Sequence, residues 1–99
     1  MATFIATYDL NKMYNPHQCF MDAAIKLGWS PWIKGSDNRW HKLPNTTISG
    51  EFSSQDAAVK AFQAIEPAAE RELKQPITVE KWIVAQYSMG SFISDDVTS

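Results

Sequence analysis

The chain has 99 residues, a length that suits a single domain with one hydrophobic core. Hydrophobic residues make up 44% of it and charged residues 20%, and the formal net charge of −2 excludes a basic field over the whole molecule that would hold nucleic acid. No segment approaches the ~20 apolar residues that span a bilayer, so we expect no membrane partner.

The amino-terminal segment 1–8 lacks the basic flank and the long apolar run of a signal peptide. Cys19 is the only cysteine, so no internal disulfide forms. Both features favour a cytoplasmic protein. We expect one domain over residues 1–88. Because the sequence turns to Gly, Ser and Asp after Met89, we expect a flexible carboxy-terminal tail over 89–99.

Residues 3–8 are rich in β-branched and aromatic side chains and predict the first strand. Neither face of this strand is polar before Asp9, so we expect both faces to be covered, as in a central strand. The two faces carry Phe4, Ala6 and Tyr8 on one side and Ile5, Thr7 and Asp9 on the other.

A first helix is predicted over about 16–27. Asn15 is its expected N-cap, Pro16 suits the first helical position, and Gln18 stands where a capping-box partner belongs. Gly28 is expected to end the helix in a left-handed conformation. The apolar side chains that recur at helical spacing are Cys19, Phe20, Ala23, Ala24 and Leu27.

The segment between the helices predicts at least one strand. Residues 29–33 are a candidate short strand, which Pro31 confines to the edge of a sheet. Residues 35–38 form a turn cluster, after which residues 39–43 either pair back or remain a loop. A further strand is predicted over 46–52, with Ile48 and Phe52 on one face.

A second helix is predicted over about 54–66, with Ser53 as its N-cap and Asp56 in its first turn, where a carboxylate suits the helix dipole. Pro67 breaks or kinks this helix, and residues 68–74 are expected to add a further turn or two. The apolar stripe consists of Ala58, Ala61, Phe62 and Ile65.

Residues 77–87 predict a last strand, which is long compared with the usual length of about 5–6 residues. Trp82 and Val84 are expected on one face, and Lys81 interrupts the other. The apolar residues expected on that other face are Ile77, Val79, Ile83, Ala85 and Tyr87.

The predicted order of strand, helix, strand, strand, helix, strand is that of an α+β, ferredoxin-like βαββαβ sandwich. Right-handed crossovers place both helices on one face of its antiparallel sheet. The opposite face is then available to solvent, a ligand or a second copy of the chain.

Nucleophilic and zinc chemistry are disfavoured. Cys19 lies on the apolar stripe of the first helix, as a buried structural thiol would. One cysteine and two histidines do not complete a typical four-ligand zinc site, and His17 and Cys19 do not face each other on a helix. The sequence also contains no phosphate-binding loop and no dinucleotide fingerprint.

The chain has four tryptophans, Trp29, Trp32, Trp40 and Trp82. They either fill the core or place at least one ring at an interface, and Trp82 on the long last strand is the candidate for a homodimer contact. Trp40 has the basic neighbours Lys34, Arg39 and Lys42. These residues either hold a single nucleic-acid strand by charge and stacking, weakly and with strong salt dependence, or form a solvated hairpin tip.

Asp9 directly follows a hydrophobic strand, so its carboxylate is expected at the rim of the sheet. There it either meets a cation or a substrate, or caps a local turn. A single carboxylate binds Mg²⁺ weakly, but a two-fold dimer that brings two copies of Asp9 together would supply a second. Mg²⁺ held in this way would activate water for attack on a phosphodiester, so Asp9 is the predicted metal ligand and the centre of any catalysis.

Residues 3–11, which end in Tyr8-Asp9-Leu10-Asn11, resemble the start of the small CRISPR-associated endoribonuclease-like proteins. They are closer still to the stand-alone relatives of those proteins, short bacterial and phage proteins often labelled SinR family. Leu27-Gly28-Trp29 and the Thr-rich segment 46–52 follow in the same order, whereas the segment 30–44 is longer than in that pattern. The resemblance implies a ferredoxin-like homodimer in which Asp9 matches a metal-linked aspartate.

Nuclease activity is uneven in that family, where some members act as structural dimers. We therefore expect a homodimeric interaction or regulatory protein of a defence system or mobile element, with little or no catalysis. The first alternative is a Mg²⁺-dependent nuclease that uses paired Asp9 residues. The second is a phage-type inhibitor that binds a host protein.

Overall fold

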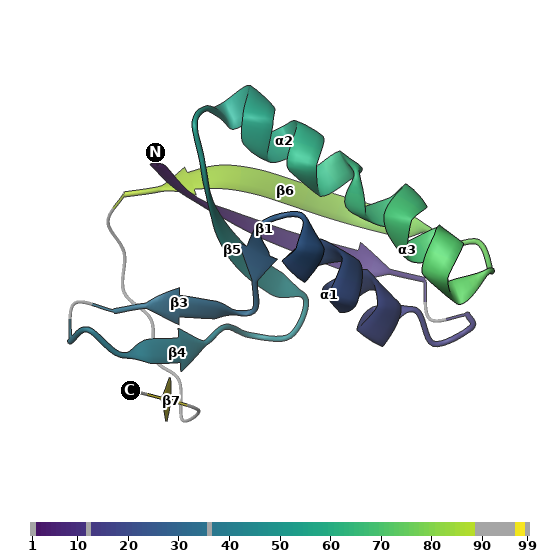
Figure 1. Ribbon diagram of the computed structural model, residues 1–99, viewed down its shortest axis with the longest axis horizontal. Helices are drawn as coiled ribbons and strands as arrows, with labels where there is room; N and C mark the ends of the chain where they lie inside the picture. The colour runs from purple at the N-terminus through teal and green to yellow at the C-terminus, as the bar shows by residue number, and fades with distance from the viewer. Residues whose placement is uncertain (1, 12, 36, 89–96, 99) are drawn as a thin grey trace.

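The computed structural model describes residues 2–11, 13–35, 37–88 and 97–98. The chain forms an α+β domain with a four-stranded antiparallel sheet in the order β2-β5-β1-β6 and a small sheet in the order β3-β4-β7 (Figure 1). The elements are β1 (Ala2–Leu10), α1 (His17–Lys26), β2 (Trp29–Ser30), β3 (Trp32–Lys34), β4 (Trp40–Lys42), β5 (Thr47–Phe52), α2 (Gln55–Gln63), α3 (Ile65–Leu73), β6 (Val79–Tyr87) and β7 (Val97–Thr98).

The central strand β1 has one covered face and one uncovered face. Phe4, Ala6 and Tyr8 are buried, whereas Thr7 and Asp9 on the other side are exposed. The prediction of a central strand is confirmed, but the prediction that both faces are covered is wrong, because all three helices pack on the same side of the sheet (Figure 1). We call the other side the open face. On β1 and β6 it carries Thr3, Ile5, Thr7, Asp9, Lys81, Ile83, Ala85 and Tyr87.

The core lies between the sheet and the helices and is joined by aromatic rings around Phe62 of α2. The ring centroid of Phe62 lies 5.9 Å from that of Tyr8, 6.2 Å from Phe20 and 6.3 Å from Trp29. These contacts join α2 to β1, α1 and β2. The position of Tyr8, and with it the end of β1 that presents Asp9, is therefore set by core packing.

The N-cap of the first helix lies one residue later than predicted. Its N-cap is Pro16, without a side-chain cap hydrogen bond, and Asn15 has a φ of 51°. The predicted cap at Asn15 is wrong, because a capping side chain reaches the first-turn amides from an extended backbone. Gly28 has a φ of 100° after the helix, as predicted for a residue that ends a helix in the left-handed region.

The second predicted helix divides into α2 and α3 at Ala64. Its N-cap is Ser54 rather than Ser53, since the Ser54 hydroxyl oxygen accepts a hydrogen bond of 3.1 Å from the backbone N–H of Ala57. Pro67 lies in the first turn of α3, where a missing N–H removes no helical hydrogen bond. The helix therefore does not end at Pro67. A new helix, α3, has already begun two residues earlier, at Ile65.

The last strand begins at Val79, and its face pattern changes along its length. The register between β1 and β6 shifts at Asp9 and Leu10, so that Lys81 pairs with Asp9 but Val79 pairs with Leu10. Val79 packs against the core, whereas Ile83 is 59% exposed. The prediction that these two side chains share a face is wrong because a register shift reverses the alternation.

β3 and β4 form a β-hairpin that extends beyond the main sheet (Figure 1). The backbone N–H of Gly35 donates to the carbonyl of Arg39 across the turn. β7 pairs with β4, whereas residues 89–96 and 99 of the expected tail lie outside the described residues. No helix in the described part of the chain is long and apolar enough to cross a membrane.

Candidate functional site

Asp9 lies at the exposed end of β1, directly after the buried Tyr8. Its cross-strand neighbour is Lys81, and with Thr7 and Ile83 the two residues line a shallow hollow of about 200 Å³. The alternative of a turn cap is not seen among the described contacts. The turn that follows β1 is instead capped by Asn11, whose side-chain oxygen accepts a hydrogen bond of 3.0 Å from the backbone N–H of Met13.

A Mg²⁺ site would need more ligands than one copy of Asp9 offers. Within the described residues no three His, Cys, Asp or Glu side chains gather closely enough to hold a metal ion. Mg²⁺ takes one or two carboxylates in addition to waters, and the cross-strand neighbour of Asp9 is Lys81, whose positive charge opposes a further cation. The residues of a single chain therefore fit Mg²⁺ poorly, and a second carboxylate would have to come from another copy.

The open face between β1 and β6 is partly apolar. Ile83 is 59% exposed, Ile5 and Tyr87 are half-buried, and Ala85 is exposed. In the main sheet β6 pairs only with β1, so its outer edge has no strand beside it among the described residues. A long edge strand of this kind is a surface on which another chain can pack.

Trp82 lies on the helix side of β6 and not on the open face, since it pairs with the buried Tyr8. Its ring centroid is 5.2 Å from that of Phe62, and the side chain is 42% exposed. A role of Trp82 in a homodimer stays a prediction. Nearby, burial raises the pKa of Glu66, and repulsion from Glu70 raises it further.

The hairpin places two tryptophans and two lysines on one face. Trp32 pairs with Lys42, and Lys34 pairs with Trp40, so each tryptophan has a lysine as its cross-strand neighbour. The ammonium nitrogen of Lys42 lies 5.5 Å from the centre of the Trp32 ring, and Trp40 is 43% exposed. This face combines charge with stacking surface.

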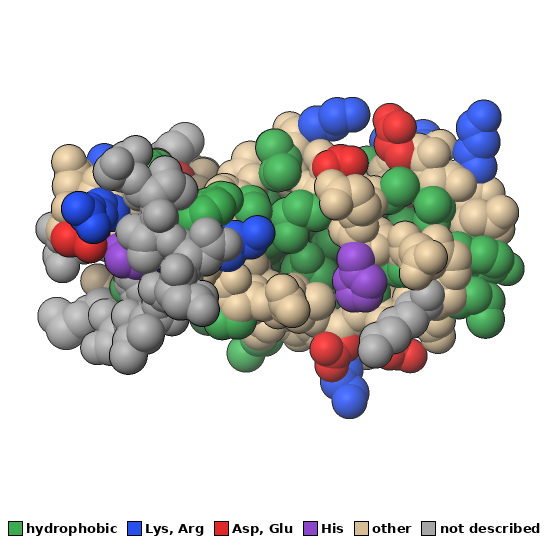
Figure 2. Space-filling view, turned by 90° about the horizontal axis from the view of Figure 1, so that it is seen from below, with side chains coloured by type: hydrophobic (Ala, Val, Ile, Leu, Met, Phe, Trp, Pro, Cys, Tyr) green, Lys and Arg blue, Asp and Glu red, His purple; other side chains and the backbone are tan. Residues whose placement is uncertain are grey.

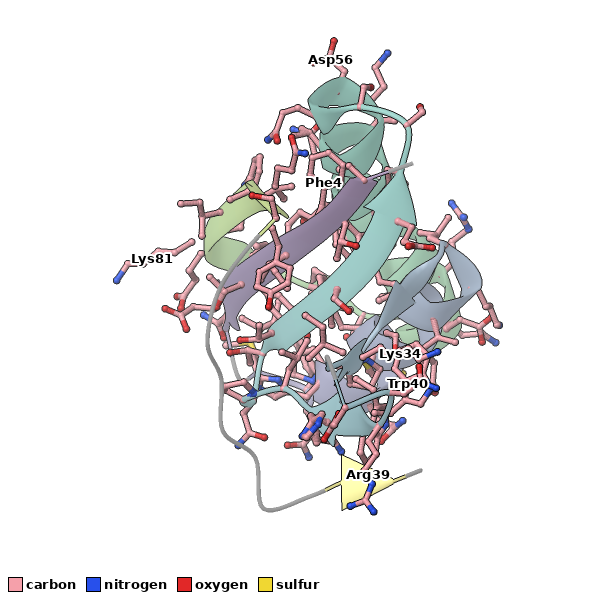
Figure 3. All side chains as sticks on the ribbon, turned by 90° about the vertical axis from the view of Figure 1, so that its left-hand side faces the viewer. Phe4, Lys34, Arg39, Trp40, Asp56 and Lys81 are labelled. Atoms are coloured by element: carbon pink, nitrogen blue, oxygen red, sulfur yellow. The ribbon has the colours of Figure 1, made fainter. Side chains whose placement is uncertain are left out.

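Arg39, the fourth residue predicted to bind nucleic acid, lies in the turn. Figure 3 shows Lys34 and Trp40 side by side and Arg39 farther along the hairpin, with Lys81 on the other side of the molecule. Asp37 reduces the positive charge of this turn. The backbone N–H of Arg39 and the imidazole of His41, which lies 3.2 Å away, lower the pKa of the Asp37 carboxyl.

A groove of about 640 Å³ lies between the hairpin and the neighbouring part of the sheet. Three aromatic side chains, those of Trp32, Trp40 and Tyr87, line it together with Lys34 and Glu51. The hydroxyl of Ser49 donates a hydrogen bond of 2.8 Å to the Trp32 carbonyl and so joins the hairpin to β5.

The residues predicted for catalysis and for nucleic-acid binding therefore fall on two separate surfaces. Lys34, Trp40 and Lys42 come together on the hairpin, whereas Asp9 lies at the far end of β1 beside Lys81. Sequence reasoning did not single out Ile83 as an interface residue. The alternation of β6 contained that signal, but the side that stays open depends on where the helices pack.

No protein-family model matches the chain, and no curated protein and no solved structure matches it significantly. The resemblance to CRISPR-associated endoribonuclease-like proteins thus stays a prediction.

Proposed function

We propose that the protein is a homodimeric interaction protein built on a ferredoxin-like βαββαβ unit. In this interpretation β1, α1, β2, β5, the α2–α3 pair and β6 are the six elements, and the hairpin is inserted between the second and third strands. The antiparallel order β2-β5-β1-β6, with the helices on one face, supports it. This arrangement leaves the open face for a second copy.

The observation that carries the proposal is the exposure of Ile83 in the middle of the open face. Its side chain is 59% exposed on an edge strand, beside the half-buried Ile5. Burying such a side chain against an apolar surface contributes about 1–2 kcal/mol for each copy. In a two-fold dimer the same patch serves both partners, so this contribution is made twice.

One end of the open face carries a negative and a positive charge side by side, so it can pair with the same end of a second copy. Asp9 and Lys81 are neighbours across the two strands. A two-fold axis close to this pair places Asp9 of one copy against Lys81 of the other, and the reverse. The pair therefore favours a second copy of this chain over a partner with a single sign of charge.

The test is sedimentation velocity of the Ile83→Lys variant at about 1–100 µM protein. Ile25→Lys is the matched control, because Ile25 is 53% exposed on α1, away from the open face. We expect wild type and Ile25→Lys to be dimers and Ile83→Lys to dissociate at least about tenfold more readily, with unchanged circular dichroism. If wild type is monomeric, or if Ile83→Lys dimerises as wild type does, the proposal is wrong.

A Mg²⁺-dependent nuclease with paired Asp9 residues is the second candidate. The position of Asp9 on the exposed rim of the open face favours it, because a dimer through this face can bring two carboxylates together. Mg²⁺-dependent cleavage of RNA or DNA that is lost in Asp9→Asn, with the dimer intact, would support this candidate. Cleavage undiminished in Asp9→Asn would rule it out.

The hairpin is proposed to add weak binding of single-stranded nucleic acid. Its alternating tryptophans and lysines supply stacking and phosphate contacts. Because the protein carries a net charge of −2, we expect binding that falls steeply with salt and weakens in Lys34→Gln. Tight binding that survives high salt would contradict this.

A role in a defence system or mobile element, or as an inhibitor of a host protein, is tested by capture of partners from bacterial lysate.

A further inference from the structure

A small pocket of about 270 Å³ lies between β6 and the place where α2 gives way to α3. The residues that line it come from these elements: Phe62, Gln63, Glu66, Val79 and Trp82. It lies on the helix side of the sheet, since Trp82 pairs with the buried Tyr8. The pocket is therefore separate from the open face, which is proposed to bind a second copy.

The pocket combines a carboxylate with aromatic rings. The exposed ring of Trp82 is held against Phe62, and Glu66 lies on the α3 side. None of the described residues that line the pocket is a lysine or an arginine, and Glu66 makes no ion pair with a described residue. An indole ring and a carboxylate together attract a cation such as an ammonium or guanidinium group.

Glu66 is held in surroundings that disfavour its negative charge. Burial raises the pKa of the Glu66 carboxyl, and repulsion from Glu70, one turn later on α3, raises it further. Lys60 of α2 is exposed and does not line the pocket, and Lys81 lies on the open face. The basic hairpin lies toward the bottom of Figure 1, on the side that Figure 2 shows from below, whereas β6 and α2 lie toward the top. A cation in the pocket would stabilise the ionised form of Glu66.

The outer edge of β6 presents backbone hydrogen-bonding groups beside this pocket. The Tyr8 N–H donates to the Thr46 carbonyl on the β5 side, so Tyr8 and Trp82 form a pair that exchanges no hydrogen bonds. The N–H and carbonyl of Trp82 therefore point outward, where no strand lies among the described residues. The Gln55 side chain donates a hydrogen bond of 3.0 Å to the Val84 carbonyl, farther along the same edge. The part of the edge next to the pocket is thus the part that can accept another chain.

We propose that the outer edge of β6 binds an extended segment of a partner protein as a further strand, with a lysine or arginine of that segment in the pocket. A residue that exchanges backbone hydrogen bonds with Trp82 places its side chain on the same face as the indole. A lysine or arginine at this position packs along the Trp82 ring and brings its cation to Glu66. In this mode of binding the backbone hydrogen bonds supply affinity, and the pocket selects the basic residue.

A second copy of the chain does not supply this basic residue. Near the pocket β6 presents Trp82 and Val84 on its helix side, whereas Lys81 lies on the open face. Two β6 edges paired about a two-fold axis therefore bring no lysine of β6 into either pocket. The charge of the pocket favours a different, basic partner, and this surface does not depend on the proposed homodimer.

The test is a titration of the ¹⁵N-labelled protein with a capped peptide in which valine and threonine alternate around one central arginine. We expect saturable shifts of the indole and backbone N–H signals of Trp82, and about fivefold weaker binding or less when glutamine replaces the arginine. Glu66→Gln should weaken binding of the arginine peptide about fivefold or more, and Trp82→Leu about threefold or more. Glu72→Gln removes an exposed carboxylate of α3 outside the pocket, so this matched control should stay within about twofold of wild type.

A methylated peptide tests whether the segment binds as a strand. Methylation of the backbone nitrogen of the central arginine removes the donor to the Trp82 carbonyl and should weaken binding about fivefold or more. The proposal is overturned if the arginine peptide at about 1 mM gives no saturable shift at Trp82, or if the glutamine peptide or the methylated peptide binds equally well. Dissociation of a dimer by the peptide, seen by sedimentation velocity, would also overturn it, because a second copy would then occupy the edge. The folding of each variant is checked in the same spectra.

Discussion

Trp29 is expected to tolerate replacement by phenylalanine far better than its burial suggests. Its side chain is 2% exposed and packs with a centroid distance of 4.7 Å against Phe52. Its indole nitrogen is nevertheless buried without a hydrogen-bond partner among the described residues. A buried donor without a partner costs about 1–3 kcal/mol, and Trp29→Phe removes it.

The same substitution also loses packing. The missing part of the indole amounts to roughly two methylene-sized groups at ~0.8 kcal/mol each, or about 1.5 kcal/mol, with a further contribution from the cavity left behind. The two effects oppose each other, so we expect the free energy of unfolding to change by less than about 1 kcal/mol.

Urea unfolding followed by circular dichroism measures this change. Phe62→Leu is the comparison. Phe62 is about as buried, at 3% exposure, but it has no buried polar atom whose unfavourable burial the substitution could remove. We expect Phe62→Leu to lose about 1–2 kcal/mol and Trp29→Phe to lose less. A loss above about 3 kcal/mol in Trp29→Phe would refute the reasoning, because it would mean that the indole N–H has a partner in solution.

Two further predictions concern backbone spacing and alkaline pH. Gly50→Ala is expected to destabilise the protein by about 1–3 kcal/mol in the same urea assay, because the added carbon would lie 2.9 Å from the Gly28 carbonyl oxygen. Gly35→Ala should cost less, since its nearest neighbours are the movable side-chain ends of Asp37 and His41, and equal losses would contradict the steric argument. Burial raises the pKa of Tyr8 from 10.0 to about 12, so its contribution to stability is complete below pH 10 and is lost as the pH rises to about 12. The urea midpoint of wild type should therefore fall more steeply than that of Tyr8→Phe over this pH range, and parallel curves would show that Tyr8 ionises normally.

The helices and long strands could be predicted from the sequence because their signals are local. The stripe around Phe62 and the β-branched run of β1 specify their elements without tertiary information. The N-cap of α2 is Ser54, one residue after the predicted Ser53, because the two serines are chemically equivalent and the sequence does not specify which of them meets the Ala57 amide. Asn15 failed as a cap because its backbone adopts a positive φ, which the sequence does not specify.

The candidate site was only partly accessible to sequence reasoning. Asp9 is exposed near the end of β1 because it lies on the open face, between the buried Tyr8 and Leu10 on the other side of the strand. The pocket beside Trp82 could not be predicted, since it forms only where α2 and α3 pack on β6. The exposure of Ile83 could likewise not be predicted, because the face of β6 that stays open depends on where the helices pack.

The most direct test of the central claim is an isotope-filtered NOE experiment on a sample mixed from labelled and unlabelled copies. If the open face is the homodimer interface, the methyl groups of Ile83 will show intermolecular NOEs to open-face side chains of the other copy, and Ile25 will show none. A monomeric sample, or a dimer in which Ile83 has no intermolecular NOE, would contradict the claim.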